Sequence, residues 1–280
     1  MAFSDIQLKV AVQSAVDAVH AEIAPLTLFS HSYNSEVDGQ YGAAIAVPTT
    51  SLSAGEFGAN GYMGEDEFGG ELVTLDKHLT TSLRITDKNL AYTGIDFARN
   101  AGKSIGAAIG RACYQAAISA ANASTLTATY SPSGDNVFNL PQIAMENDMP
   151  VNGSVALVSP ATWTQVMKNI GAYSVYGGTS MIQQGIANNC LGFKAVVPCA
   201  YLPSGTNGII IAENALGTVS RYLPPVFDDG VTSTKVVDDE NGFVFGLREF
   251  TDNKFGYGYV AGVTLFGAKV LDAKGVLKLV

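Results

Sequence analysis

The sequence predicts an α+β fold, and three features of the chain support this prediction. Apolar residues recur at helical spacing in the first 25 residues and again from residue 94 to residue 122. Between these segments the side chains alternate strictly from Val73 to Thr86, which is typical of a half-buried strand. After residue 151, short apolar runs are separated by turns and one helical segment. The 280 residues suffice for one large domain or two ordinary ones.

The first predicted element is an amphipathic helix that ends before Pro25. Ser4 and Gln7 have the spacing of a capping box at its start. We expect the helix to pack in the core of its own chain, and the alternative is an arm that packs on a neighbouring molecule. Its apolar stripe consists of Leu8, Val12, Ala15, Val19 and Ile23.

A long β-hairpin is predicted next. Alternating runs from Tyr41 to Thr49 and from Val73 to Thr86 flank a glycine-rich segment. The second run would extend roughly 45 Å, more than twice the length of a typical strand. Because a two-stranded ribbon is marginal in water, we expect support from outside its own fold, on a neighbouring subunit. The side chains predicted to be covered are Val73, Leu75, Leu79, Leu83 and Ile85, and those predicted to face solvent or polar partners are Asp76, His78 and Arg84.

The segment from Gly94 to Asn122 predicts a helix of about 43 Å. One stripe of this helix is apolar and includes Ile105 and Ile109. A second stripe contains small residues four apart, namely Gly94, Ala98, Gly102, Gly106 and Gly110. Each internal glycine costs about 0.5–1 kcal/mol relative to alanine, so we expect another backbone to cross closely at this stripe.

The second half of the chain predicts an α/β segment followed by strands. A buried strand after Val151 stops at Pro160, where a helix with Trp163 and Met167 begins. Short strands are predicted at 193–197 and 208–212, and several more strands lead to the C-terminus.

The composition argues against several classes of protein. A formal net charge of -9 and a pI of about 4.7 are not typical of a protein that grips nucleic acid. Three cysteines without metal spacing suit a reduced compartment and are expected to be buried and inert. We expect no signal peptide, a cytosolic location, and no membrane span in the uncharged stretches 112–134 and 195–212.

No catalytic, cofactor or metal site is predicted. The histidines His20, His31 and His78 lack metal spacing and an evident nucleophile partner. The chain has no GxSxG elbow, phosphate-binding loop or HExxH helix. An acidic cluster at residues 65–67 has no recognised ligand spacing.

Charge is distributed unevenly along the chain. Seven acids and no base lie between Glu36 and Glu71, whereas six bases and three acids lie between Leu72 and Arg111. An acidic run of this kind is most often a solvated loop.

The order of these pieces resembles the major capsid proteins of tailed bacteriophages, whose fold is shared with encapsulin shells. The residues that carry the resemblance are LDKHLTTSLRITDKNLA, ALVSPATWTQVMKN, GIANNCLGFKAVVPCAYLP and FGYGYVAGVTLFGAKVLD. It covers nearly the whole chain, and it rests on the order and spacing of the segments.

The resemblance implies a division of the chain. Its parts would be an N-terminal arm at 1–37, an extended hairpin loop at 38–86, a peripheral domain at 87–150 with a spine helix at 94–122, an axial α/β domain at 151–235, and a return to the peripheral domain at 236–280.

The resemblance also implies function. The protein would self-assemble into hexamers and pentamers of an icosahedral shell that encloses double-stranded DNA, without enzymatic activity or cofactors. Its location would be the virion capsid, assembled in the host cytoplasm. Further partners would be scaffolding, portal and decoration proteins, with weak, non-specific DNA contacts and no membrane. Because residues 50–70 contain no lysine, we expect non-covalent stabilisation instead of the cross-link of some family members.

The charge distribution adds a hypothesis about contacts between subunits. We expect the acidic hairpin tip of one subunit to dock on the basic strand and spine region of the next. The residues involved would be Glu56, Glu65, Asp66 and Glu67 on the tip, and Lys77, Arg84, Lys88, Arg99 and Lys103 on the neighbour. The alternatives to a viral shell are an encapsulin-like compartment and a soluble α/β enzyme with a dispersed site.

Overall fold

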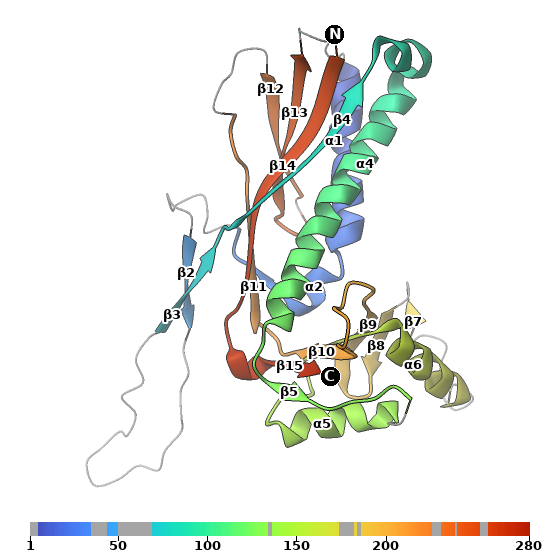
Figure 1. Ribbon diagram of the computed structural model, residues 1–280, viewed down its shortest axis with the longest axis vertical. Coiled ribbons are helices and arrows are strands. Elements are labelled where there is room, and N and C mark those ends of the chain that lie inside the picture. Colours follow the sequence, from blue (N-terminus) through green and yellow to red (C-terminus); the bar gives the residue numbers. More distant parts are fainter. Residues whose placement is uncertain are drawn as a thin grey trace.

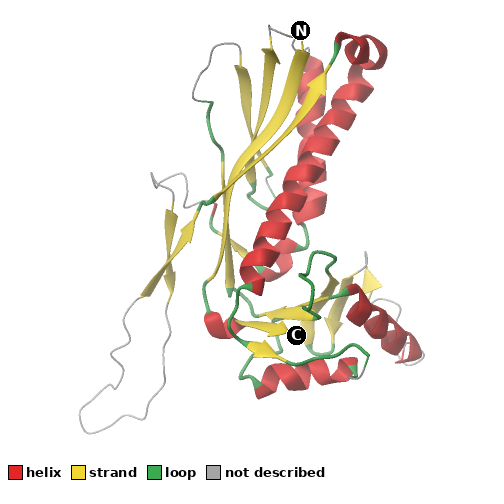
Figure 2. Ribbon diagram, viewed as in Figure 1, coloured by secondary structure: helices red, strands yellow, loops and turns green. Residues whose placement is uncertain are grey.

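The protein consists of a long sheet backed by two long helices, with a second sheet at one end of these helices (Figure 1). Figure 2 shows that both long helices lie on the same side of the long sheet. The computed structural model describes residues 5–34, 44–49, 69–133, 136–173, 182–183, 186–225, 231–238, 240–252 and 257–280. None of the helices in these ranges is long and apolar enough to cross a membrane.

The long sheet is organised around one strand, β14 (Tyr257–Val270). It lies between β4 (Lys77–Ile85) and β13 (Val244–Asp252) and also pairs with β11 (Leu216–Arg221). All pairs that β14 makes are antiparallel. The strands are β1 (His31–Ser32), β11 (Leu216–Arg221), β14 (Tyr257–Val270), β13 (Val244–Asp252) and β12 (Val231–Val237) in spatial order, with β4 (Lys77–Ile85) joined to β14.

The long helices are α1 (Asp5–Ile23) and α4 (Asp87–Asn122). Helix α1 packs against α4 of the same chain, so the expectation of a core helix is confirmed. Helix α4 begins seven residues before the predicted start at Gly94. Glycine weakens a helix interior by about 1 kcal/mol but does not end it, and the residues before Gly94 continue the helix.

The stripe of small residues on α4 is the contact with α1, as predicted from the glycine spacing. A Cβ atom on Gly102 or Gly106 would overlap the backbone carbonyl of Ala11 or Ala15. On another face of α4, Ile105 and Ile109 occupy the space that a side chain on Gly262 of β14 would need. Helix α4 is therefore packed closely on both α1 and the sheet.

The alternating segment 73–86 is two strands, and the prediction of one continuous strand is wrong. Strand β3 (Gly69–Thr74) pairs with β2 (Ala44–Thr49) in a two-stranded sheet, whereas β4 pairs with β14. The chain leaves strand geometry at Leu75 and Asp76 while the alternation continues across the break.

The alternation nevertheless identified the covered face. Val73, Leu75 and Ile85 are buried, and Asp76, His78 and Arg84 are exposed. The expectation that a neighbouring subunit must cover β4 is wrong, because Leu79, Leu83 and Ile85 pack on the core of their own chain. The long strand β14 provides the missing support for β4.

The second sheet has seven strands, and two helices lie beside it (Figure 1). The predicted buried strand before Pro160 is confirmed as β6 (Val155–Val158), and the predicted helix is confirmed as α6 (Pro160–Tyr173). The sheet order is β5 (Thr127–Ala128), β15 (Val276–Leu279), β10 (Gly208–Ile211), β6 (Val155–Val158), β9 (Phe193–Pro198), β8 (Ile186–Cys190) and β7 (Ile182–Gln183). Its helices are α5 (Leu140–Glu146) and α6 (Pro160–Tyr173), with the short 3-10 helices η1 (Val137–Asn139) and η3 (Ala273–Gly275). The short helix α2 (Leu26–Phe29) follows α1 and leads into β1 of the long sheet.

The chain passes between the two sheets at positions that differ from the predicted boundaries. Strand β11, within residues 151–235, belongs to the long sheet, β12 of the same sheet crosses the predicted boundary at 235, and β15, within residues 236–280, belongs to the second sheet. Strand β11 is buried at five of its six positions, so its sequence has no alternation that distinguishes one sheet from the other. The division into peripheral and axial domains stays a prediction.

The contact between α1 and α4 predicts the effect of a single methyl group. Gly106→Ala gains helix propensity, but its Cβ overlaps Ala15, so we expect a net loss of about 1–3 kcal/mol of unfolding free energy. Denaturant unfolding of the unassembled chain measures this loss. Ser104→Ala, at an exposed position of the same helix, should stay within about 0.5 kcal/mol of the original protein. A Gly106→Ala protein more stable than the original would contradict the packing.

Candidate functional site

The hairpin of β2 and β3 is fixed to the body of its own chain. Its inner face forms a second hydrophobic cluster, separate from the main core, that reaches β11. Strand β3 crosses β14 so closely that a Cβ atom on Gly267 would overlap the carbonyl of Thr74. The buried members of this cluster are Ile45, Val47, Val73, Leu75 and Val219.

An ion pair lies beside this hairpin root. Lys269 Nζ of β14 donates to Glu71 Oε2 of β3 at 2.6 Å, and both side chains are 43% exposed. Exposed pairs of this kind contribute little stability, so the apolar cluster carries most of the attachment. Thr49 pairs with Gly69, so the described part of the hairpin ends at this pair.

The acidic half of the predicted contact lies outside the described residues. This holds for Glu56, Glu65, Asp66 and Glu67. Lys88 belongs to α4, but its side chain is also outside the described part. Their role between subunits therefore stays a prediction.

The side chains of the other four predicted bases are described, and they lie on two elements, β4 and α4. Arg84 faces away from α4 and lies 4.7 Å from the centre of the Tyr257 ring. Lys77 lies 3.1 Å from Asp76, and Arg99 on α4 lies 3.7 Å from Asp96. Lys103 is exposed on α4. Three of these bases are thus already in contact with another side chain of their own chain.

A groove runs between α1 and β12, the last strand of the long sheet among the described residues. Two adjoining cavities of about 430 and 540 Å³ share Val12 and Gln13. Leu8 and Val16 add apolar surface from α1, and Thr234 and Val236 line the groove from β12. The groove combines an apolar helical stripe with the edge of a sheet.

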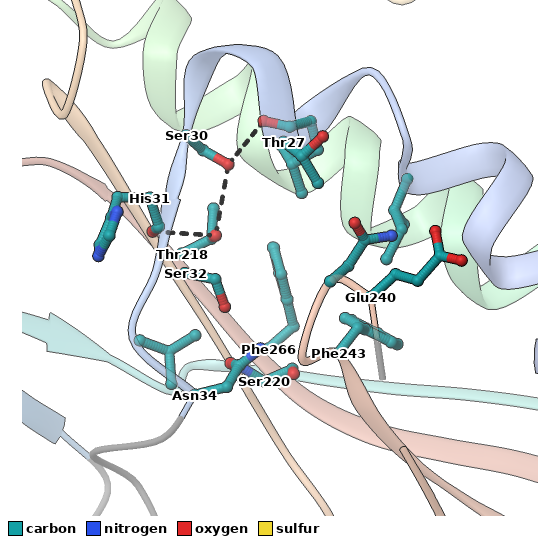
Figure 3. A pocket seen from close by; sticks show the side chains of 14 residues that line it. Thr27, Ser30, His31, Ser32, Asn34, Thr218, Ser220, Glu240, Phe243 and Phe266 are labelled. Carbon is teal, nitrogen blue, oxygen red and sulfur yellow. Dashed lines mark hydrogen bonds between the residues drawn. The ribbon is translucent and has the colours of Figure 1, made fainter. Parts of the chain in front are cut away.

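A third cavity, of about 390 Å³, lies between the α2–β1 segment and β11 (Figure 3). Its polar side chains are occupied in holding these segments together. Ser30 Oγ donates to the carbonyl of Leu26 at 2.8 Å. Asn34 Nδ2 donates to the carbonyl of Gly242 at 2.6 Å, and Asn34 Oδ1 accepts from the backbone N–H of Ser220 at 2.5 Å. These bonds give the pocket a structural role.

The three cysteines are buried, in agreement with their prediction as inert thiols. Burial raises the pKa of Cys113, Cys190 and Cys199 above the ordinary value for a thiol. Since the thiolate is the reactive form, all three side chains are both inaccessible and protonated at neutral pH.

One polar cluster was not found from the sequence. His20, near the end of α1, contacts Asp238 and Glu240, which lie more than 200 residues further along the chain. Nothing in the local sequence around any of these residues indicates the contact. Within the described part of the chain, no group of three or more His, Cys, Asp or Glu side chains is arranged to hold a metal ion.

Comparison with known proteins identified one family. A family model described as phage capsid protein matches residues 70–279. No curated protein matches the sequence.

Solved structures share the fold at low identity. A structure from Ralstonia phage GP4, titled as a capsid, has a TM-score of 0.59 and 12% identity over 89% of this chain and 86% of that chain. One from Mycobacterium phage Che8 has a TM-score of 0.57 and 12% identity over 89% and 88%. A virus-like particle from Pyrococcus furiosus has a TM-score of 0.56 and 11% identity over 96% of both chains.

Burial of the thiols predicts their reactivity. In native protein at pH 8, we expect less than about a tenth of the cysteine to react with a maleimide in the time that labels the chain fully in guanidinium. Mass spectrometry of the labelled peptides measures the extent at each position. Rapid native labelling of Cys113, Cys190 or Cys199 would contradict the burial of that side chain.

Proposed function

Because the chain belongs to the family of phage capsid proteins, we propose that it assembles into hexamers and pentamers that build an icosahedral shell around double-stranded DNA. The observation that carries this proposal is the family match over residues 70–279. Family membership itself makes the chain a structural protein of a phage capsid. Assembly takes place in the host cytoplasm under this proposal, with scaffolding, portal and decoration proteins as further partners.

Contact between subunits is made by the acidic segment between β2 and β3. The hairpin root supports this proposal, because its apolar cluster fixes β2 and β3, the strands that flank this segment. The segment from Glu36 to Glu71 carries seven acids and no base, so it favours a basic neighbour. Arg84 on the sheet, or Arg99 and Lys103 on α4, provide two separate basic surfaces for it.

Packaged DNA is contacted weakly and without sequence specificity. A net charge of -9 opposes strong attraction to phosphates. Subunits with this net charge form few ion pairs with DNA, so few ion pairs must break when the genome leaves the shell.

A second candidate function is a shell that encloses protein instead of DNA. One observation favours it. The groove between α1 and β12 has room for an extended cargo peptide, which would pair with the edge of β12 and cover Leu8 and Val12. Sequencing of nucleic acid and mass spectrometry of protein from purified particles would distinguish the two contents.

Assembly itself is tested by expressing the full chain and examining it by negative-stain electron microscopy. We expect shells, tubes or rings of capsomers. The proposal would fail if the protein remained a monodisperse monomer at high concentration, also in the presence of lysate from infected cells.

The acidic contact is tested by charge reversal. Glu65→Lys, Asp66→Lys and Glu67→Lys together should reduce the yield of particles on the order of tenfold and make assembly sensitive to salt, because attraction between subunits becomes repulsion. Sedimentation separates particles from free subunits.

A matched variant controls for net charge. Asp17→Lys, Glu146→Lys and Glu213→Lys change the net charge by the same amount at positions on the body, and we expect normal particles from it. Normal particles from the hairpin variant, or equal losses in both variants, would rule out docking through the acidic segment.

A further inference from the structure

The last turn of α1 is joined to the turn between β12 and β13 through one histidine. We propose that His20 is a proton-operated clasp, which holds α1 to this turn when the imidazole is doubly protonated and loosens when it is neutral. The clasp is a property of the folded chain and does not depend on what the shell contains.

Both ring nitrogens of His20 face carboxylates. Nδ1 lies 3.2 Å from Asp238 Oδ2, and Nε2 lies 3.3 Å from Glu240 Oε2. The Asp238 side chain is only 3% exposed, whereas His20 is 36% and Glu240 is 78% exposed. The imidazole thus connects a buried acid to a solvated one.

Only the imidazolium satisfies both contacts. With a hydrogen on each nitrogen, His20 donates to both acids. A neutral ring carries one hydrogen, so one lone pair must face a carboxylate oxygen. Each neutral tautomer therefore loses one of the two attractive contacts.

Asn241 offers the neutral ring an alternative partner. Its Nδ2 lies 2.9 Å from Asp238 Oδ2 and 3.0 Å from His20 Nδ1. The amide donates to Asp238 in either state, and its second hydrogen can bond Nδ1 only after Nδ1 has lost its proton. Because Asn241 belongs to the same turn, proton loss replaces a charge-assisted contact with a neutral hydrogen bond, which weakens the clasp without removing every contact.

The described residues of the turn that holds His20 make hydrogen bonds of their own. Asp238 Oδ1 accepts from the backbone N–H of Glu240 at 3.2 Å, and the Gly242 N–H donates to the Asp238 carbonyl at 2.7 Å. The Gly242 carbonyl accepts from Asn34 Nδ2. Proton loss from His20 thus acts on α1, because the turn keeps its other bonds.

The other charges around His20 do not replace these contacts. Asp17 of α1 and Lys235 of β12 line the same cavity of about 540 Å³. Glu22 of α1 accepts from Arg111 Nε of α4 at 2.9 Å, and this contact raises the pKa of Arg111 above its ordinary value. With Asp238 and Glu240 these groups make the surroundings of His20 predominantly acidic.

The sign of the effect follows from the contacts. Histidine changes its charge between about pH 5 and 8. The clasp requires the imidazolium form, so it is stronger at the acidic end of this range and weaker at the alkaline end. Because the same side chains line the groove beside α1, proton loss also loosens one wall of that groove.

Hydrogen exchange of the full chain at pH 5.5 and pH 8.0, corrected for intrinsic rates, tests the proposal. Protection in the last turns of α1, relative to β10, should be about fivefold higher at pH 5.5, which is the size expected for a charge-assisted contact partly open to water. His20→Gln should bring this ratio close to one. His31→Gln, at an exposed histidine in edge-to-face contact with Tyr33, should leave it unchanged.

A milder variant keeps the test independent of folding. Glu240→Gln alters an exposed side chain and leaves the buried acid in place, so the ratio should fall by about half. The proposal is overturned if the original protein shows no pH difference in α1, if His20→Gln retains the difference, or if Glu240→Gln leaves it unchanged.

Discussion

Helix α4 is held between α1 and β14 by contacts that leave no space for a side chain. On one side, Gly102 and Gly106 admit the backbone of α1, and on the other, Gly262 admits Ile105 and Ile109. These contacts place a helix, a second helix and a sheet at the shortest distance that their backbones allow. The long sheet depends on this arrangement, because buried side chains of β4 and β14 belong to the same hydrophobic core as those of α1 and α4.

The two-stranded sheet uses the same physical principle on the opposite side of β14. Gly267 lets β3 cross directly over β14, and the apolar cluster around Val73 and Val219 fixes the crossing. The body is therefore complete in one chain, including the support of β4.

Sequence reasoning succeeded where periodicity reports packing directly. The alternation gave the buried face of 73–86, and the glycine spacing indicated the close crossing at α4. It failed where the partner is distant in sequence. The break at Leu75 leaves the alternation intact, so β14 as the partner of β4 could not be inferred. Asp238, a partner of His20, lies 218 residues further along the chain. The contact of Arg84 with Tyr257 joins segments that are also distant in sequence, so it could not be inferred either.

The central claim is that each subunit has a self-contained body and reaches its neighbour through residues 50–68. A cryo-electron microscopy map of assembled particles, at side-chain resolution, tests it most directly. We predict α1 on α4 of the same subunit, with Ala11 against Gly102, and residues 50–68 in contact with an adjacent copy. A map in which α1 packs on a neighbouring α4, or in which residues 50–68 contact only their own subunit or solvent, would contradict the account.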